Sequence, residues 1–102
     1  MDEIIRGTTP SFYFQDFGFE VGTITAATFL VLQAGAPIIK KALADASVLA
    51  DSLRWTLTQE ESLQLDASKP ATIRCKWKAG ALCGTSESLT LEVRSFGDDE
   101  VL

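Results

Sequence analysis

The sequence predicts an all-β protein in which roughly seven or eight short strands form an antiparallel sandwich. Several segments alternate apolar and polar residues, which is typical of a strand with one buried face. Glycine, proline and polar turn residues interrupt these segments at intervals that suit a sandwich. A clear helix-start signal occurs once, near residues 58–65. Because 102 residues suffice for one core and are too few for two, we expect a single domain over 1–102.

The first two strands are predicted from short apolar segments. Residues 3–6 contain two isoleucines and stop at a glycine. Residues Ser11–Gln15 read Ser-Phe-Tyr-Phe-Gln. Because side chains alternate along a strand, Phe12 and Phe14 should face the core and Tyr13 the opposite side.

A long strand and its return arm are predicted next. Residues Ile24–Gln33 are the strongest strand candidate, since they are rich in threonine, phenylalanine, leucine and valine. Residues 34–37, Ala-Gly-Ala-Pro, have turn chemistry. The following segment has two interpretations. Alanine, leucine and lysine favour a helix over 37–49, whereas a hairpin needs a strand at 38–41, then a loop and a short strand. We favour the hairpin as the simplest return from the turn.

A capping box predicts one short helix after another alternating strand at 53–57. The Thr58 hydroxyl can accept a hydrogen bond from the Glu61 N–H, and the Glu61 carboxylate can accept one from the Thr58 N–H. We expect this helix to end near Leu65, after about two turns. A helical turn before the penultimate strand resembles a corner of immunoglobulin-like sandwiches, so the predicted fold class is immunoglobulin-like.

The last part of the chain predicts a hairpin and a tail. Residues 72–78 alternate apolar and basic side chains, and residues 88–96 return beyond a loop bracketed by Gly80 and Gly84. Residues 97–102 form an acidic tail that we expect to be mobile unless something docks it. The side chains predicted to face the core in these strands, and the other core aromatic residues, are Ile73, Cys75, Trp77, Leu89, Leu91, Val93, Phe12, Phe14, Phe29, Trp55 and Phe96.

The reactive residues argue against catalysis. The chain has no histidine, which removes the commonest general base and metal ligand. Cys75 alternates with apolar residues and should be buried, whereas Cys83 follows in the loop, out of register for a disulfide. We expect both to be reduced thiols in a protein made in a cytosol. Glu60 and Glu61 are explained by the helix cap, and the acids at 98–100 by a solvated tail. We predict no enzyme activity, no metal and no cofactor.

Charge and hydropathy argue against further classes of partner. The net charge of −5 disfavours nucleic acid, whose binding needs a basic surface. No run reaches the ~18 apolar residues of a membrane span, and Asp2 and Glu3 make the start of the chain acidic, unlike a secretory signal. A basic stripe on 72–78 is interpreted as a solvated face whose cations pair with glutamates of the next strand. The stripe is Arg74, Lys76 and Lys78, and the glutamates are Glu87 and Glu92. We predict no nucleic acid, membrane or small-molecule substrate.

Four short motifs follow one another along the chain. They are Ile-Ile-Arg-Gly-Thr-Thr-Pro at 4–10, Ile-Thr-Ala-Ala at 24–27 before a strand that ends at Gln33, Trp-Thr-Leu-Thr-Gln-Glu-Glu at 55–61, and Asp-Glu-Val-Leu at 99–102. Together they resemble, in the same order, motifs of small structural proteins of phages and prophages of Gram-positive bacteria. The layout is also similar to the immunoglobulin-like N-terminal domains of phage baseplate upper proteins.

The resemblance implies a virion component that is made in the cytoplasm of the bacterial host. It implies repeated contacts with other copies of the chain or with other virion proteins. A position in the tail or baseplate is the first expectation, and head decoration or head–tail joining is the alternative. No catalytic site is implied. This chain departs from the pattern at Leu30 and Leu32, where related chains carry polar residues.

These two leucines are the first candidates for an interface. If Phe29 and Val31 face the core, Leu30 and Leu32 face outward. Another part of the same chain, such as 37–49, would then cover them, or they would form a subunit interface, because contiguous exposed apolar surface usually marks association.

Three aromatic residues are the second candidates. Tyr13 lies opposite the inward phenylalanines, and Phe17 and Phe19 lie in a loop at 16–22 that contains two glycines. Aromatic residues in loops often anchor protein interfaces. They also fit a second hypothesis, a module that binds a glycan or protein of the host surface. The third hypothesis, an enzyme, would be limited to a carboxylate mechanism.

Overall fold

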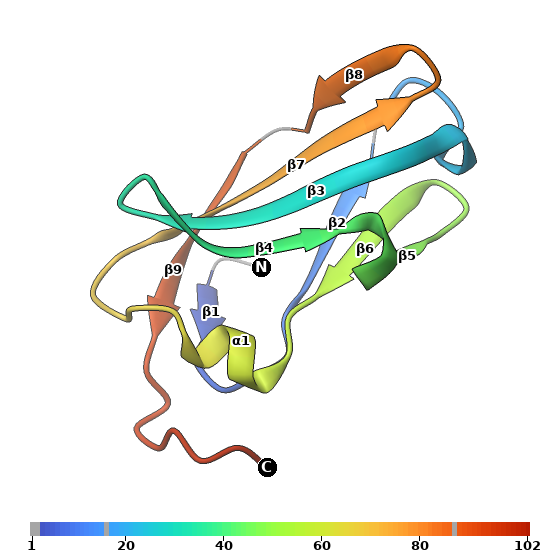
Figure 1. Cartoon of the computed structure of the whole chain (residues 1–102). Helices are drawn as coiled ribbons and strands as arrows, with labels where there is room; N and C mark the ends of the chain where they lie inside the picture. Colours follow the sequence, from blue (N-terminus) through green and yellow to red (C-terminus); the bar gives the residue numbers. More distant parts are fainter. Residues whose placement is uncertain (1–2, 16, 87) are drawn as a thin grey trace.

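Nine described strands form two β-sheets that pack face to face (Figure 1). The computed structural model describes residues 3–15, 17–86 and 88–102. The strands are β1 (Glu3–Ile5), β2 (Ser11–Gln15), β3 (Ile24–Gln33), β4 (Ala36–Ala42), β5 (Ala46–Val48), β6 (Ser52–Thr56), β7 (Ala71–Ala79), β8 (Leu82–Thr85) and β9 (Leu89–Arg94). The helical elements are α1 (Gln59–Leu63) and the 3-10 turns η1 (Val21–Thr23) and η2 (Leu43–Asp45).

The larger sheet has the strand order β1-β9-β7-β3-β4, with β8 also paired to β7, and the smaller sheet has the order β2-β6-β5. This arrangement confirms the predicted all-β sandwich with one short helix. Among the described strands, every pair is antiparallel except β1 with β9, which departs from the expected pattern. Residues 6–10 carry the chain directly from the larger sheet to the smaller one. β1 therefore lies beside the last strand and forms no hairpin with β2.

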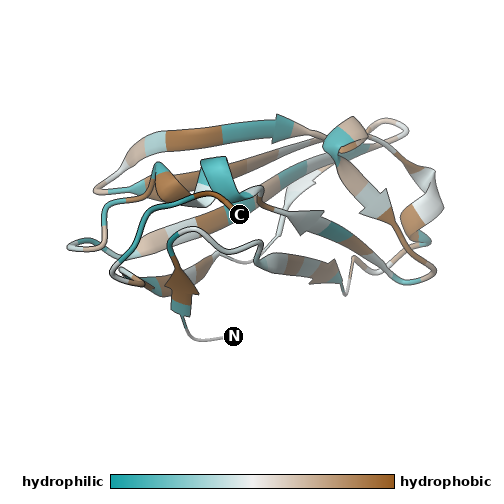
Figure 2. Ribbon diagram, turned by 90° about the horizontal axis from the view of Figure 1, so that it is seen from below, coloured by the Kyte–Doolittle hydropathy of each residue, from teal (hydrophilic) through white to brown (hydrophobic). Residues whose placement is uncertain are grey.

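The core lies between the sheets, where alternate side chains of facing strands meet. The ring centroid of Phe29 on β3 lies 5.4 Å from those of both Phe14 on β2 and Trp55 on β6. Figure 2 shows the alternation as hydrophobic and hydrophilic bands along the strands. Each large side chain buried in this way contributes roughly 1.5–3 kcal/mol. The predicted core residues that are buried are Phe12, Phe14, Phe29, Trp55, Ile73, Cys75, Leu91 and Val93.

Three predicted core residues are more exposed than expected. Phe96 is 74% exposed, because β9 ends at Arg94 and the chain leaves the sheet before this ring. Leu89 shares the inward face with Ile73, its partner on β7, yet it is 43% exposed at the border of a groove between the sheets. Trp77 is half-buried. The prediction was therefore wrong for Phe96 and too strong for the other two.

The predicted hairpin of strands 24–33 and 38–41 is confirmed, but β4 begins at Ala36, so the turn is shorter than the predicted 34–37. β3 and β4 pair from Thr28–Ala42 to Gln33–Ala36, and the two turn residues Ala34 and Gly35 have φ angles of 52° and 78°. Two successive positive φ values are the conformation of a type I′ hairpin turn. The chain then makes η2 and the short strand β5, so no helix covers 37–49.

The capping box of α1 is also confirmed. The Glu61 N–H donates to Thr58 Oγ1 at 3.1 Å, and the Thr58 N–H donates to Glu61 Oε1 at 2.9 Å. Ser62, which is fully buried, connects this helix to the start of the chain. Its hydroxyl donates to the Thr8 carbonyl at 2.8 Å and accepts from the Gly7 N–H at 2.9 Å. The helix thereby closes one end of the sandwich (Figure 1).

β8 and β9 lie one after the other along the same side of β7. β8 pairs with residues 76–79 of β7, and β9 pairs with residues 71–73. Between these two stretches, the Ser86 N–H donates to the Cys75 carbonyl at 2.8 Å. Cys83 lies opposite Lys78, so the two cysteines are out of register and both are free thiols, as predicted.

Candidate functional site

The outer face of the larger sheet carries an apolar strip. Leu30 and Leu32 lie on the side of β3 opposite to the buried Phe29 and Val31, and both remain partly exposed. They face outward as predicted. The segment from β4 to β5 continues the sheet edge and the smaller sheet, so it does not cover them. They line a shallow groove of about 600 Å³ together with Thr28, Pro37 and other residues of neighbouring strands.

Cations frame this strip on both sides. Lys40 on β4 and Arg74 on β7 are the direct cross-strand neighbours of Leu30. Lys76 lies one row further along β7, opposite Thr28. All three cations are exposed and line the same groove. We call this surface, Leu30 and Leu32 with Lys40, Arg74 and Lys76, the basic–apolar face.

The charges of the basic–apolar face are unpaired with acids in the part of the chain that the structure describes. The ion pairs found there join other cations, namely Arg6, Lys41, Lys69 and Arg94, to carboxylates elsewhere. Arg74 donates only a neutral hydrogen bond, from Nε to Ser88 Oγ at 3.1 Å. The expected pairing with Glu92 is wrong, because Glu92 pairs with Arg94 on its own strand. Glu87, the other expected partner, lies outside the described residues.

Cys75 borders the same groove from beneath. Burial raises the pKa of its thiol to about 11. Since only the thiolate is a strong nucleophile, this side chain is a packing residue at neutral pH. The groove therefore offers apolar contact and positive charge, with no activated nucleophile among its described lining residues.

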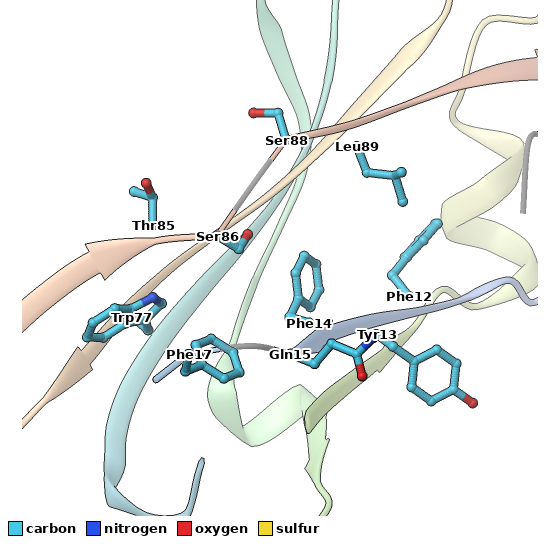
Figure 3. Close-up of a pocket in the computed structure, with 10 residues that line it drawn as sticks. All are labelled: Phe12, Tyr13, Phe14, Gln15, Phe17, Trp77, Thr85, Ser86, Ser88 and Leu89. Carbon is cyan, nitrogen blue, oxygen red and sulfur yellow. The ribbon is translucent and has the colours of Figure 1, made fainter. Parts of the chain in front are cut away.

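A second, smaller groove of about 370 Å³ lies between the two sheets (Figure 3). One side is β2, an edge strand of the smaller sheet, and the other is the break between β8 and β9. Phe12, Phe14 and Leu89 point toward its floor, and Trp77 and Phe17 close one end. Hydroxyl and amide groups lie at its border, from Gln15, Thr85, Ser86 and Ser88.

The two loop phenylalanines pack against the chain itself. The centroid of Phe19 lies 4.9 Å from that of Trp77, and Phe17 lies 6.2 Å from Trp77 in an edge-on arrangement. Both rings are partly buried against the core. On the neighbouring strand β8, Gly84 leaves room for the indole. A Cβ atom at this position would lie 2.4 Å from Trp77 Cζ2. Their position in a loop suggested rings that are free of the core, and this is corrected: both rings pack against one end of the core. A contact role for them stays a prediction.

The predicted contact residues do not form one site. Tyr13 is 57% exposed on the outer face of the smaller sheet, beside Arg54 on β6. Tyr13 is among the residues that line the groove between the sheets, but Figure 3 shows its ring directed away from it. The leucines lie on the outer face of the other sheet. Phe17 and Phe19 lie at the end of the core, so the candidates fall on three separate surfaces.

The residues of β4 that line the first groove were not predicted as part of a site. Lys40 and Pro37 belong to the groove only because the type I′ turn folds β4 back beside β3. The predicted hairpin contains the information that was needed, because the register of its two strands places Lys40 next to Leu30. The acidic tail was predicted, but its local contacts were not. Asp99 pairs with Arg6 at 3.0 Å, and the Leu102 N–H donates to Gln59 Oε1 at 2.7 Å.

Two other kinds of feature are absent from residues 3–15, 17–86 and 88–102. No group of three or more Cys, Asp or Glu side chains there is placed to hold a metal ion. None of the helices in this part of the chain is long and apolar enough to cross a bilayer.

No protein-family model matches this sequence, and no curated protein matches it. The class of protein is therefore defined by its own fold and surfaces. It is an all-β sandwich with an apolar strip framed by cations on one outer face and an aromatic groove between its sheets.

Proposed function

We propose that this chain is a non-enzymatic structural protein of a phage particle, a building block of the tail or baseplate that acts through repeated protein–protein contacts. The basic–apolar face is the single observation that carries the assembly role. Adjacent outward apolar side chains on a soluble domain usually mark a surface that a partner covers. The motifs at 4–10, 24–27, 55–61 and 99–102, which resemble those of small phage structural proteins, support the placement in a virion.

The energetics suit a repeated assembly. Leu30 and Leu32 are already partly buried, so covering them contributes less than the roughly 3–6 kcal/mol of two fully exposed leucines. This gain is too small to hold an isolated pair of molecules against the loss of translational and rotational freedom. In a ring or lattice, each copy makes the same contact with more than one neighbour, so the contacts reinforce one another.

The placement in a virion is tested by quantitative mass spectrometry of purified particles of the phage whose genome encodes the chain. We expect the chain at a fixed, multiple copy number per particle, retained after salt washing and density centrifugation. A chain found only in the soluble fraction of the infected cell would contradict the proposal.

The groove between the sheets favours a second candidate function, recognition of a host-surface glycan or protein. Its aromatic floor with hydroxyl and amide groups at the border is a common design for binding sugars and peptides. Saturable binding of the purified chain to host cell walls, abolished by Phe17→Ser and retained in Leu30→Lys/Leu32→Lys, would support this candidate. If both variants bind host cell walls as well as the natural chain does, the groove is not the binding site and this candidate function is refuted.

A further inference from the structure

We propose that the basic–apolar face binds the acidic segment 97–102 of a second copy of this chain, so that copies associate head to tail. The inference rests on the proposed building-block function and names the partner of its contact surface. It commits to one occupant because that segment matches the face in charge and in hydropathy.

Charge complementarity is the first argument. The face presents three exposed cations, Lys40, Arg74 and Lys76, without acidic partners among the described residues. The segment 97–102 has three consecutive carboxylates at 98–100, of which Asp98 and Glu100 are free of the Asp99–Arg6 pair. The chain as a whole has a charge of −5, so the face is a local exception to its own surface. Opposite potentials of this kind steer association and select the partner.

Hydropathy is the second argument. Val101 and Leu102 follow the carboxylates and are 43% and 100% exposed, although both are apolar. Leu30 has Lys40 and Arg74 as its cross-strand neighbours, so the face, like the segment, combines apolar and charged side chains. An extended segment of six residues spans about 20 Å. The face crosses the three strands β4, β3 and β7, about 10 Å between the outer two, so the segment is long enough to cross it.

The position of the segment points to a second molecule. It continues from β9 past the end of the sandwich that α1 closes, and Figure 1 shows it running away from β3 and β4. Its contacts within the chain, Asp99 with Arg6 and Leu102 with Gln59, are made at that end and hold it there. One copy therefore presents the segment at its end and the face on its side. Such a heterologous contact generates a ring when the rotation closes, and a filament when it does not.

The test is a charge swap followed by light scattering over a concentration series. The tail variant is Asp98→Lys/Glu100→Lys, which leaves the Asp99–Arg6 pair intact. The face variant is Lys40→Glu/Lys76→Glu. A matched control, Glu20→Lys/Asp51→Lys, makes the same charge change as the tail variant at two exposed acids elsewhere. Circular dichroism and thermal melting check that every variant is folded.

We expect the tail variant and the face variant each to associate at least tenfold more weakly than the natural chain, and the control to associate like it. Combining both changes in one chain should restore association, because the charges are then complementary again with reversed sign. A tail variant that associates like the natural chain, or a combined variant that stays monomeric, would overturn the inference.

The same experiment separates this inference from the proposed function. If Leu30→Lys/Leu32→Lys abolishes association and the tail variant does not, the face is an assembly surface with another occupant, and only this inference fails. If the natural chain is monomeric at every concentration, both the head-to-tail contact and self-assembly through the face are refuted.

Discussion

The ammonium nitrogen of Lys41 lies 3.0 Å from Glu61 Oε2, and this contact joins the edge strand β4 to helix α1. The same carboxylate accepts the Thr58 N–H through its other oxygen. Glu61 is thereby shared between the helix cap and the larger sheet. Because α1 follows the smaller sheet in the chain, the pair connects both layers of the sandwich at one end.

Glu61 should give the stability a specific dependence on acid. Partial burial acts to raise its pKa, but the hydrogen bonds from Thr58 and the interactions with Lys41 outweigh it, so the pKa is lowered from its ordinary value of 4.5. A lowered pKa in the folded state means that the stabilisation is present above pH 4.5 and is lost as the pH falls through the folded value. Glu61→Gln should cost about 1 kcal/mol at pH 7, with a difference that shrinks in acid.

Urea unfolding at several pH values measures this effect, and Glu60→Gln at the exposed neighbouring carboxylate is the control. The pKa of Lys41 is raised above 10.5 by its hydrogen bond to Glu61 and by the charge of that carboxylate. Its contribution is therefore present below pH 10.5 and is lost at more alkaline pH. If Glu61→Gln lowers the free energy of unfolding by the same amount at pH 3 and at pH 7, the ionisation of this carboxylate does not contribute to stability.

Gly84 should tolerate no side chain. A Cβ atom there would lie 2.4 Å from Trp77 Cζ2, so Gly84→Ala must displace the indole from Phe17 and Phe19. Overpacking of this kind costs about 1–3 kcal/mol. Thermal unfolding and the tryptophan emission spectrum report the two consequences. Gly22→Ala, where nothing lies within 4 Å, should leave both unchanged. Equal melting of the two variants would contradict the role of Gly84.

The turn between β3 and β4 should accept a stabilising substitution. Ala34 has a φ of 52°, and this left-handed conformation costs an alanine about 1 kcal/mol. Asparagine before Gly35 is the preferred sequence of a type I′ turn. Ala34→Asn should therefore raise the free energy of unfolding by about 1 kcal/mol, measured by urea denaturation. A destabilised variant would show that the turn has another conformation.

The two thiols should react very differently. Cys83 is exposed, and Cys75 is buried with a pKa raised to about 11. A thiol reagent at pH 8 should label one cysteine rapidly in the folded chain and both in urea. Cys83→Ser should abolish the rapid phase. Rapid labelling of that variant would mean that β7 is open at Cys75.

Much of the fold follows from local patterns. The strict alternation over β6 and β7 and the capping box at Thr58 each depend on neighbouring residues, so the sequence predicts them well. The parallel pairing of β1 with β9 depends on which edge is free after all other strands have paired, and no local pattern contains that information. Phe96 shows the same limit: it lies two residues beyond the end of β9, where no strand holds its ring against the core.

The surfaces were predicted less completely than the core. Alternation placed Leu30 and Leu32 on the outer face of their strand. The cations around them come from β4 and β7, so the basic–apolar face exists only in the assembled sheet. For Phe17 and Phe19, loop composition suggested free anchors, whereas Trp77 lies close enough in space to pack against both rings.

The most direct test of the central claim is the solution mass of the natural chain and of Leu30→Lys/Leu32→Lys over a concentration series. A control, Gln15→Lys/Thr56→Lys, adds two lysines to exposed positions of the smaller sheet. The account predicts that the natural chain and the control form the same defined oligomer, and that the leucine variant is a folded monomer. A leucine variant with the same mass as the natural chain at every concentration would contradict the claim that this face drives assembly.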